Sequence, residues 1–369
     1  MHILHVVGAR PNFMKAAPVV RALAACPDVR QTLVHTGQHY DAVMSDVFFT
    51  QLEMPQPDCN LEVGSGTHAV QTARIMLAFE PALVERKPDL VLVYGDVNST
   101  VAAALVCSKL SVPVGHVEAG LRSGDRTMPE EINRLLTDQL SDLLFTPSPD
   151  ADTNLLREGI DQSKIHRVGN VMIDTLIHLL PQAVKHPSSH QSSPYALVTL
   201  HRPSNVDDIP WLLDLLTTLN DLSFQLPVIF PVHPRTQQRL REAGITYSRQ
   251  AGPGSSAGGC ALTLLDPLPY LEFLALQRNA TLVITDSGGI QEETTYLGVP
   301  CLTVRENTER PITITQGTNQ LVGRDLTRLR DAAAEILKSN RGKKMCPIPL
   351  WDGHTSARIA EIILRYRKG

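Results

Sequence analysis

Short apolar runs of strand length alternate with longer amphipathic stretches along nearly the whole chain, and no other feature of the sequence limits the fold so strongly. Strands that alternate with helices form parallel sheets whose two faces are covered by helices. The strands predicted in the first half are 2–7, 30–36, 89–94, 112–117 and 143–146. The helices predicted between them are 11–25, 41–53, 67–86, 98–110 and 129–140. This half is therefore expected to form a doubly wound α/β sheet.

The same alternation starts again after the polar segment 182–194, which can bury little surface and which we interpret as a linker or an exposed loop. The strands predicted in the second half are 195–200, 228–232, 262–265, 282–285 and 301–304. The helices predicted there are 209–222, 234–243, 270–277, 290–297 and 326–337. Glycine and serine in 250–259 indicate a surface loop. Periodicity predicts a last helix at 355–366 but does not assign it to either half.

Length and charge agree with two domains that act on a small molecule. A chain of 369 residues with 43% hydrophobic content is too long for one ordinary core. The net charge of −4 comes from 34 basic and 38 acidic residues without long runs of one sign. The sequence therefore shows neither a nucleic-acid-binding stripe nor a polybasic membrane segment.

A cytoplasmic protein without a metal or another cofactor is expected. The first apolar run is only of strand length and follows no basic region, so it does not resemble a signal peptide. No stretch approaches the roughly 18 consecutive apolar residues of a membrane helix. The cysteines lie far apart and form no C-x-x-C pair or His-Cys cluster, which predicts reduced thiols rather than metal ligands.

Acidic residues follow two of the predicted strands. Ligands of open α/β sheets bind outside the carboxyl ends of the strands, so residues at these positions are candidates for a site. Asp96 follows the strand that ends at residue 94, Glu118 follows the next strand, and Glu130 begins the predicted helix 129–140. An Asp at such a turn is often an N-cap, and a Glu at a helix start often complements the helix dipole. Other residues of the turn after Asp96 can cap the helix, so we interpret the three acids as candidate acid/base groups.

A phosphate-binding turn is predicted where strand 282–285 meets the following helix. Ser287, Gly288 and Gly289 would offer a hydroxyl and open backbone N–H groups at the positive end of the helix. Glu293, further along the helix, can accept hydrogen bonds from ribose hydroxyls. The pattern is neither Walker A nor G-x-G-x-x-G, which argues against ATP hydrolysis and NAD binding. The two glycines could instead serve close packing of helix on strand.

Cations, histidines and an aromatic residue stand after other predicted strands. Arg10 and Lys15 follow the first strand, and they either bind an anion or are simply solvated. His201 follows one strand of the second half and His233 closes the next, and each either faces the site or has a structural role. Arg310 follows the strand that ends near residue 304 and can pair with an anion. Phe273 can stack on a base, although core packing is the more common role of a phenylalanine.

Taken together, these segments resemble the non-hydrolysing UDP-N-acetylglucosamine 2-epimerases. The resemblance runs in order from residue 3 to about residue 365. It is carried by Gly8-x-Arg10-Pro11, Gly95-Asp96, Gly115-His116-Val117-Glu118-Ala119-Gly120-Leu121-Arg122, Pro129-Glu130-Glu131-x-Asn133-Arg134, Thr285-Asp286-Ser287-Gly288-Gly289-Ile290-Gln291-Glu292-Glu293 and Glu309-Arg310-Pro311.

The resemblance implies a GT-B-type α/β fold, in which two Rossmann-like domains face each other across a cleft and the C-terminal helix packs back on the first domain. The domains expected are 1–170 with 355–369, which would carry the acid/base residues, and 171–354, which would bind UDP. It also implies a cytoplasmic homodimer that needs no cofactor.

The implied reaction interconverts UDP-GlcNAc and UDP-ManNAc. UDP is eliminated to give bound 2-acetamidoglucal, a proton returns to carbon 2 from the other face, and UDP adds back. The resemblance makes Asp96, Glu118 and Glu130 acid/base residues and places His201 at the diphosphate, without saying which carboxylate removes the proton. The substrate-binding residues that it implies for the UDP-sugar as a whole are Arg10, Lys15, Arg134 and His233. It places Leu268 and Phe273 at the uracil, Ser287, Gly288 and Gly289 at the diphosphate, Glu293 at the ribose, and Arg310 on the phosphate side.

Two segments depart from the family pattern. Asn12 stands where many members have Glu, and segment 38–44 differs from the one that helps to hold a second, activating UDP-GlcNAc in bacterial members. Tyr40 and Asp41 therefore leave allosteric activation open. This segment is also similar to relatives that act on 2,3-diacetamido uronates, so the substrate could be a modified UDP-sugar. The sequence also leaves open a hydrolysing epimerase, a GT-B glycosyltransferase and a non-catalytic UDP-sugar sensor.

Overall fold

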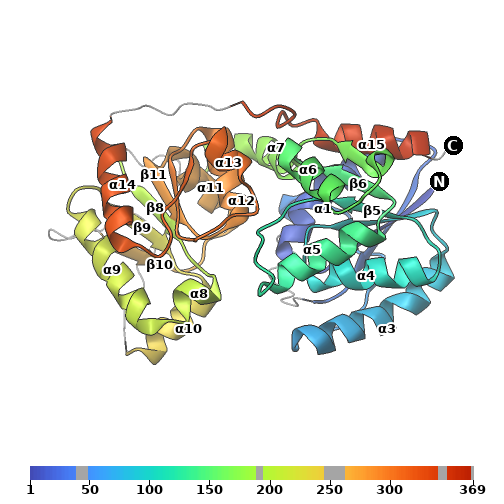
Figure 1. Cartoon of the computed structure of the whole chain (residues 1–369), viewed down its shortest axis with the longest axis horizontal. Helices are drawn as coiled ribbons and strands as arrows, with labels where there is room; N and C mark the ends of the chain where they lie inside the picture. The colour runs from blue at the N-terminus through green and yellow to red at the C-terminus, as the bar shows by residue number, and fades with distance from the viewer. Residues whose placement is uncertain (39–48, 188–193, 245–261, 340–346, 367–369) are drawn as a thin grey trace. The chain divides into compact units, whose positions relative to one another are not determined.

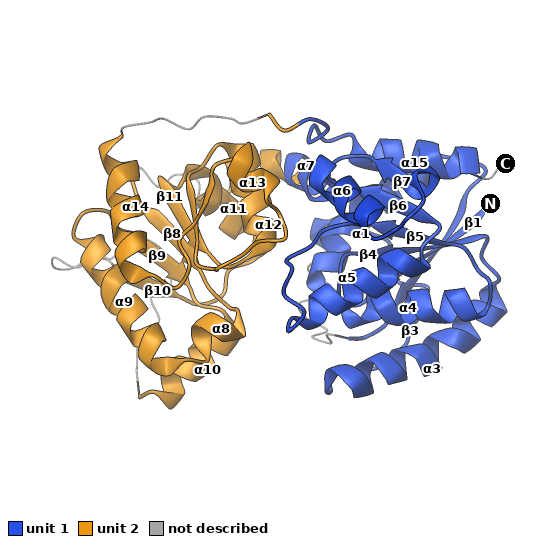
Figure 2. Ribbon diagram, in the orientation of Figure 1, with its two compact units in different colours: residues 1–178, 349–369 blue, residues 179–348 orange. Residues whose placement is uncertain are grey.

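The chain forms two compact units. The computed structural model describes residues 1–38, 49–187, 194–244, 262–339 and 347–366. The N-terminal unit comprises residues 1–178 and 349–369, and the C-terminal unit comprises residues 179–348 (Figure 2). The last segment of the chain thus belongs to the unit that the first segment builds.

The N-terminal unit contains a parallel sheet of seven strands in the order β3-β2-β1-β4-β5-β6-β7. The strand order reverses direction at β1 and β4, which is the topological switch point where such sheets bind ligands. The strands are β1 (His2–Val7), β2 (Arg30–His35), β3 (Cys59–Asn60), β4 (Leu90–Tyr94), β5 (Val114–Val117), β6 (Leu143–Thr146) and β7 (Ile165–Arg167). The helices are α1 (Arg10–Ala24), α3 (His68–Arg86), α4 (Asn98–Lys109), α5 (Pro129–Leu140), α6 (Pro149–Arg157), α7 (Val171–Lys185) and α15 (Thr355–Tyr366).

The C-terminal unit contains a parallel sheet of six strands in the order β10-β9-β8-β11-β12-β13. The strands are β8 (Ala196–Thr199), β9 (Val228–Pro231), β10 (Leu262–Leu265), β11 (Leu282–Thr285), β12 (Cys301–Thr303) and β13 (Asn319–Leu321). The helices are α8 (Pro203–Val206), α9 (Ile209–Ser223), α10 (Pro234–Glu242), α11 (Tyr270–Asn279), α12 (Gly288–Leu297), α13 (Ile312–Thr315) and α14 (Leu326–Lys338).

Side chains of β8 alternate between two hydrophobic cores because successive residues of a strand point to opposite faces of the sheet. Ala196 and Val198 lie in the core that α9 and α14 complete. Leu197 lies in the core that α11 completes, and the adjoining Tyr195 lies there as well. Burial on both faces explains why its first three residues, Ala196 to Val198, are all apolar.

The final helix, α15, is anchored to the N-terminal unit. Asp174 of α7 accepts hydrogen bonds from the backbone N–H groups of Thr355 and Ser356, at 3.1 and 2.7 Å. These are donors that a helix start otherwise leaves without partners. α15 then packs along α1 (Figure 1). The predicted α/β fold with two parallel sheets and a returning C-terminal helix is therefore confirmed.

Several short elements and two longer helices were not predicted, and one prediction was partly wrong. The missed strands β3, β7 and β13 are only two or three residues long and lie at sheet edges, so they carry almost no periodic signal. The missed helices are α6, α7 and the four-residue helices α8 and α13. α7 extends to Lys185, so the first residues of the segment interpreted as a linker are helical. The predicted loop 250–259 and most of the predicted helix 41–53 lie outside the described residues. Among the described residues, no helix has the length and apolar character of a membrane span.

Candidate active site

Two turns at the carboxyl ends of β4 and β5 carry the first candidate acids. β4 and β5 are neighbouring parallel strands, paired at Tyr94 and Val117, so Asp96 and Glu118 follow adjacent strand ends. Glu118 has a φ of 73°, which is unfavourable for a residue with a side chain. The N–H group of Glu118 and that of the next residue both donate to the carbonyl of Phe145 in β6, at 3.1 and 3.0 Å. The sheet therefore holds Glu118 in a strained conformation.

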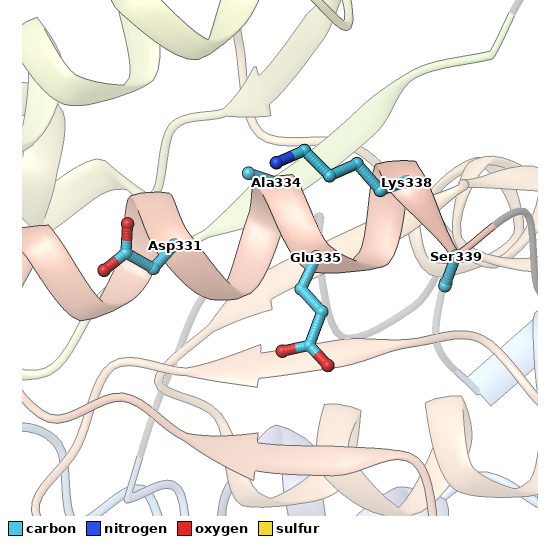
Figure 3. A pocket seen from close by; sticks show the side chains of 5 residues that line it. All are labelled: Asp331, Ala334, Glu335, Lys338 and Ser339. Carbon is cyan, nitrogen blue, oxygen red and sulfur yellow. The ribbon is translucent and has the colours of Figure 1, made fainter.

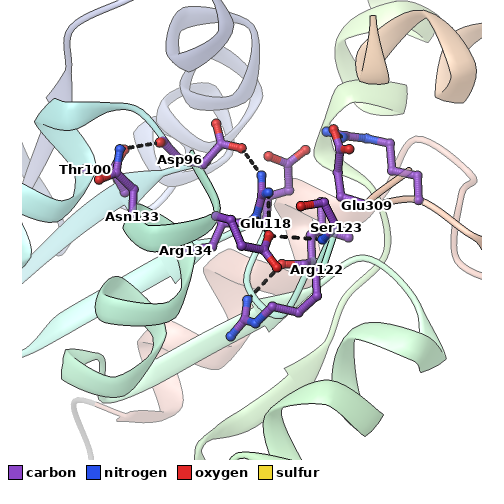
Figure 4. Close-up of polar contacts among 12 residues, drawn as sticks. Asp96, Thr100, Glu118, Arg122, Ser123, Asn133, Arg134 and Glu309 are labelled. Carbon is purple, nitrogen blue, oxygen red and sulfur yellow. Dashed lines mark hydrogen bonds and ion pairs between the residues drawn. The ribbon is translucent and has the colours of Figure 1, made fainter. Parts of the chain in front are cut away.

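Each of these two carboxylates has a cationic partner. Lys15 of α1 forms a buried ion pair with Glu118. Arg134 of α5 pairs with Asp96, and the neighbouring Asn133 donates to the backbone carbonyl of Asp96 at 2.8 Å (Figure 4). Lys15 and Arg134, which were predicted as substrate-binding residues, thus contact the candidate acid/base residues themselves.

Glu131, the neighbour of candidate Glu130, supports the site rather than facing it. Its carboxylate pairs with Arg134 at 2.6 Å and accepts from the N–H groups of Ser123 and Gly124 at 3.0 and 2.9 Å. Burial opposes ionisation of Glu131, but these backbone donors and Arg134 outweigh it and hold the pKa below its usual value. Glu131 therefore fixes both the loop before α5 and the guanidinium that reaches Asp96.

Asp96 and Glu130 line one pocket of about 260 Å³ in the N-terminal unit. His68 and Gln71 of α3 line it as well, together with Asn133 of α5. The pocket thus combines two carboxylates with neutral hydrogen-bonding groups, a composition suited to a polar ligand. Sequence reasoning missed His68 and Gln71, because α3 follows a connection with no strand-end motif.

A close approach of cation and helix explains the first glycine of the predicted phosphate turn. A Cβ atom on Gly288 would overlap with Nη1 of Arg310, so only glycine leaves room for this guanidinium at the start of α12. Arg310 also pairs with Glu292 at 2.7 Å and with Glu309. This glycine therefore allows the close approach of Arg310 to the helix N-terminus, and phosphate binding at the turn stays a prediction.

Glu293 has a buried carboxyl group whose pKa lies near neutral pH. Burial raises its pKa to about 7, against a lowering effect of the hydrogen bond that the Tyr270 hydroxyl donates at 2.8 Å. Ionisation of this group is therefore sensitive to any further hydrogen-bond donor. The candidate uracil contacts, Leu268 and Phe273, are half-buried against the core that contains Leu197.

Asp286 organises the turn that bears His201. Its buried carboxylate accepts from the backbone N–H groups of His201 and Arg202 at 3.0 and 2.9 Å, and from Asn205 at 3.1 Å. The side chain of His201 contacts it as well, through Nδ1 at 3.0 Å. Burial opposes ionisation, yet these donors hold the pKa of Asp286 below its usual value. The sequence indicates Asp286 only as part of the helix-start motif.

His233 is the N-cap of α10 and accepts from the N–H group of Arg235 at 3.3 Å. Its ring lies 5.4 Å from that of His201. The predicted residues thus form two groups, one in each unit. Those of the N-terminal unit are Arg10, Lys15, Asp96, Glu118, Glu130 and Arg134, and those of the C-terminal unit are His201, His233, Leu268, Phe273, Ser287, Gly288, Gly289, Glu293 and Arg310.

A further pocket, of about 370 Å³, lies along one face of α14 (Figure 3). It is lined by Asp331, Ala334, Glu335, Lys338 and Ser339. A single helix and the residue after it supply this lining, away from the carboxyl ends of the strands, and we assign it no function. Within the described part of the chain, no group of three or more His, Cys, Asp or Glu residues is arranged to hold a metal ion.

Comparison with known proteins identifies the family. Residues 21–364 match the family model described as UDP-N-acetylglucosamine 2-epimerase. The UDP-N-acetylglucosamine 2-epimerase of Methanococcus maripaludis is 42% identical over 372 residues, with 98% of each chain covered. The UDP-2,3-diacetamido-2,3-dideoxy-D-glucuronate 2-epimerase of Pseudomonas aeruginosa is 40% identical, with 99% of this chain and 100% of that protein covered. The crystal structure of Methanocaldococcus jannaschii UDP-GlcNAc 2-epimerase in complex with UDP-GlcNAc and UDP is similar with a TM-score of 0.89 at 40% identity, and covers 99% of this chain and 100% of that chain. The resemblance seen in the sequence is confirmed, and the chain belongs to the UDP-N-acetylglucosamine 2-epimerase family, a family of isomerases.

Proposed function

We propose that this protein interconverts UDP-GlcNAc and UDP-ManNAc without hydrolysis. The observation that carries the proposal is the pair of carboxylates at adjacent strand ends, Asp96 and Glu118, each held by a cation. A non-catalytic sensor or a glycosyltransferase would not need two such carboxylates side by side, one of them held in a strained backbone conformation. An epimerase that moves a proton on and off a sugar carbon needs them.

The reaction is an elimination followed by an addition. A carboxylate removes the proton from carbon 2, the bond between carbon 1 and the UDP oxygen breaks, and a double bond forms between carbons 1 and 2. A second acid then returns a proton to the opposite face of carbon 2, and UDP bonds to carbon 1 again. Asp96, Glu118 and Glu130 are the acid/base residues in this proposal. Lys15 forms an ion pair with Glu118, and Arg134 forms one with Asp96.

The C-terminal unit is proposed to hold UDP throughout the reaction. The departing diphosphate gains negative charge, which the backbone N–H groups at the start of α12 and the guanidinium of Arg310 can stabilise. His201 is proposed to contact the diphosphate, and Glu293 to accept from the ribose hydroxyls. Leu268 and Phe273 would pack against uracil. No metal or other cofactor takes part in this scheme.

A modified UDP-sugar is the second candidate substrate. The relative that acts on UDP-2,3-diacetamido-2,3-dideoxy-D-glucuronate is 40% identical, close to the 42% of the relative that acts on UDP-N-acetylglucosamine. The reaction at carbon 2 is the same for both sugars, so the same acid/base residues serve either. The choice between them is a question of contacts to the other positions of the ring.

Deuterium exchange tests the proposal. The protein is incubated in deuterium oxide with UDP-GlcNAc alone and, separately, with the 2,3-diacetamido uronate. We expect UDP-ManNAc with deuterium at carbon 2, and exchange restricted to the uronate would assign the second candidate. Free ManNAc would indicate a hydrolysing epimerase, transfer of the sugar to an acceptor a glycosyltransferase, and binding without exchange a sensor.

We further propose that the protein acts in the cytoplasm as a homodimer. The cysteines Cys26, Cys59, Cys107 and Cys301 are free, as in a reducing compartment. On α3, three apolar side chains follow one another at seven-residue intervals and are all exposed, the middle one, Leu77, to 73%. Residues at this spacing share one face of a helix, and a second copy of the chain would cover it.

A further inference from the structure

Beneath the two turns that carry Asp96 and Glu118 lies a buried carboxylate that no step of the proposed reaction uses. Asp138 of α5 is 0% exposed. One of its oxygens contacts Nδ1 of His116 at 2.6 Å. The other accepts from the N–H group of Gly120 at 3.1 Å and pairs with Arg122 at 2.7 Å. Arg122 in turn pairs with Glu158 at 2.6 Å.

The network of His116, Asp138, Arg122 and Glu158, called here the Asp138 network, reaches both turns. Nε2 of His116 contacts the carbonyl of Gly95 at 2.8 Å, and Gly95 directly precedes Asp96. Asp138 accepts a hydrogen bond from the N–H group of Gly120, two residues after Glu118. The carboxylate of Asp138 is therefore connected to the backbone beside two candidate acid/base residues. It reaches the residue before Asp96 through His116, and it contacts Gly120 near Glu118 directly.

Hydrogen-bond chemistry fixes the direction of these contacts. A backbone carbonyl only accepts, so Nε2 of His116 donates to the carbonyl of Gly95, while Nδ1 lies against the carboxylate of Asp138. Arg122 contacts the carboxylates of both Asp138 and Glu158 and so gives each buried or partly buried acid a cationic partner. Burial opposes ionisation of Asp138, but His116 and Arg122 outweigh it and lower its pKa.

The turns themselves need such support. Gly95, Glu118 and Gly120 have φ values of 61°, 73° and 81°, and Glu118 is the member of the three whose side chain makes this conformation costly. A turn released from its hydrogen bonds can relax by changing φ at Glu118. That change would move the carboxylate, and a displacement of about 1 Å can reduce a rate about 10²-fold.

We propose that Asp138 is a positioning residue. It holds Gly120 by a direct hydrogen bond and Gly95 through His116, and so keeps the carboxylates of Asp96 and Glu118 where proton transfer requires them. The inference rests on the proposed function and deepens it. Loss of the network impairs the proton transfers at carbon 2, whereas UDP binding, proposed for the other unit, stays intact. A residue with a purely structural role would affect neither property selectively.

Two substitutions of His116 separate positioning from general stability. The amide nitrogen of Gln reaches about as far as Nε2, so His116→Gln keeps a donor for the Gly95 carbonyl and loses the one for Asp138. The amide nitrogen of Asn reaches about as far as Nδ1, so His116→Asn keeps the contact with Asp138 and releases Gly95. We expect kcat for carbon 2 exchange to fall about 10²-fold in His116→Asn and about 10-fold or less in His116→Gln.

Asp138→Asn and a matched control complete the experiment. Asp138→Asn turns an acceptor for Gly120 and Arg122 into a donor, and we expect kcat to fall about 10²-fold with KM for the UDP-sugar and Kd for UDP within about threefold. Asp174→Asn alters another buried carboxylate of the same unit, which accepts two N–H groups at the start of α15. This control is expected to lower Tm while kcat stays within about threefold of wild type.

The outcomes distinguish the two proposals. Equal kcat values for the two His116 variants, a loss in Asp138→Asn no larger than in the control, or a change in KM with kcat retained would each overturn the positioning role. The His116 pair keeps the experiment decisive if Asp138→Asn does not fold. If wild-type protein exchanges no deuterium with any UDP-sugar, the proposed function fails and the positioning role fails with it. Wild-type exchange with unimpaired variants overturns the positioning role alone.

Discussion

Replacing Glu293 with glutamine should make the free protein more stable at alkaline pH and weaken its binding of UDP. The carboxyl group is buried, and its pKa is raised from 4.5 to about 7. At about 1.4 kcal/mol per pH unit, that difference corresponds to about 3 kcal/mol of unfavourable free energy when the group ionises in the folded protein. Glutamine has nearly the same shape and no charge, so Glu293→Gln removes this term.

The sign follows from the two proton affinities. Because the pKa of Glu293 is higher in the folded protein, its carboxyl group keeps a proton between about pH 4.5 and about pH 7, where the unfolded form has lost it. The stability associated with this proton is complete below pH 4.5 and is lost as pH rises through about 7. Wild type and variant should therefore be similarly stable at pH 4.5, and the variant should be more stable by up to about 3 kcal/mol at pH 8.

Urea unfolding of both proteins from pH 4.5 to pH 8.5, followed by circular dichroism, measures the difference. Calorimetry with UDP supplies the second observable, because hydroxyl groups that donate to a carboxylate favour its ionised form. Wild-type affinity relative to the variant should rise as pH increases through 7, by about tenfold or more, as expected for hydrogen bonds to a charged group. The variant also serves as the control for titration of UDP itself. Parallel pH curves for the two proteins would refute the assignment of Glu293.

Four more substitutions test the acid/base residues, the start of α12 and the proposed dimer interface. Asp96→Asn or Glu118→Gln should lower kcat for carbon 2 exchange about 10²-fold or more, and turnover within a few-fold of wild type would remove that residue from the acid/base set. Gly288→Ala places a methyl group in the space that an Arg310 nitrogen occupies, so it should displace the guanidinium and weaken UDP binding about tenfold, as calorimetry would show. Leu77→Glu should convert a dimer to a monomer by light scattering with little change in Tm, and an unchanged mass would exclude α3 from the interface.

The strand-end rule predicted where several candidate residues lie in the fold, because it depends on local sequence. Asp96 and Glu118 follow apolar runs that are unmistakable as buried strands, and both lie at the ends of β4 and β5 as expected. The start of α12 was predicted in the same way, from two glycines after such a run. These features needed only the order of residues along short segments of the chain.

Partners distant in sequence could not be predicted in this way. Lys15 and Glu118 are 103 positions apart, and only the packing of α1 against the sheet brings them into contact. Asp138 lies in the last turn of α5, and its burial depends on how this helix packs. The short strands at the sheet edges were missed for a related reason, since pairing with a neighbour defines them and their own residues do not.

The division of residues between the units follows from the chemistry. Elimination separates the sugar from UDP, and addition requires that the same UDP return to carbon 1. A site that bound UDP only through the sugar would lose it at the intermediate, so the contacts with UDP must be independent of the reacting carbon. The residues of α12 and Arg310 lie in one unit, and Asp96, Glu118 and the Asp138 network lie in the other. In the proposed reaction, the turn of Glu118 can therefore be strained and tightly fixed, as proton transfer requires, without compromising the binding of UDP.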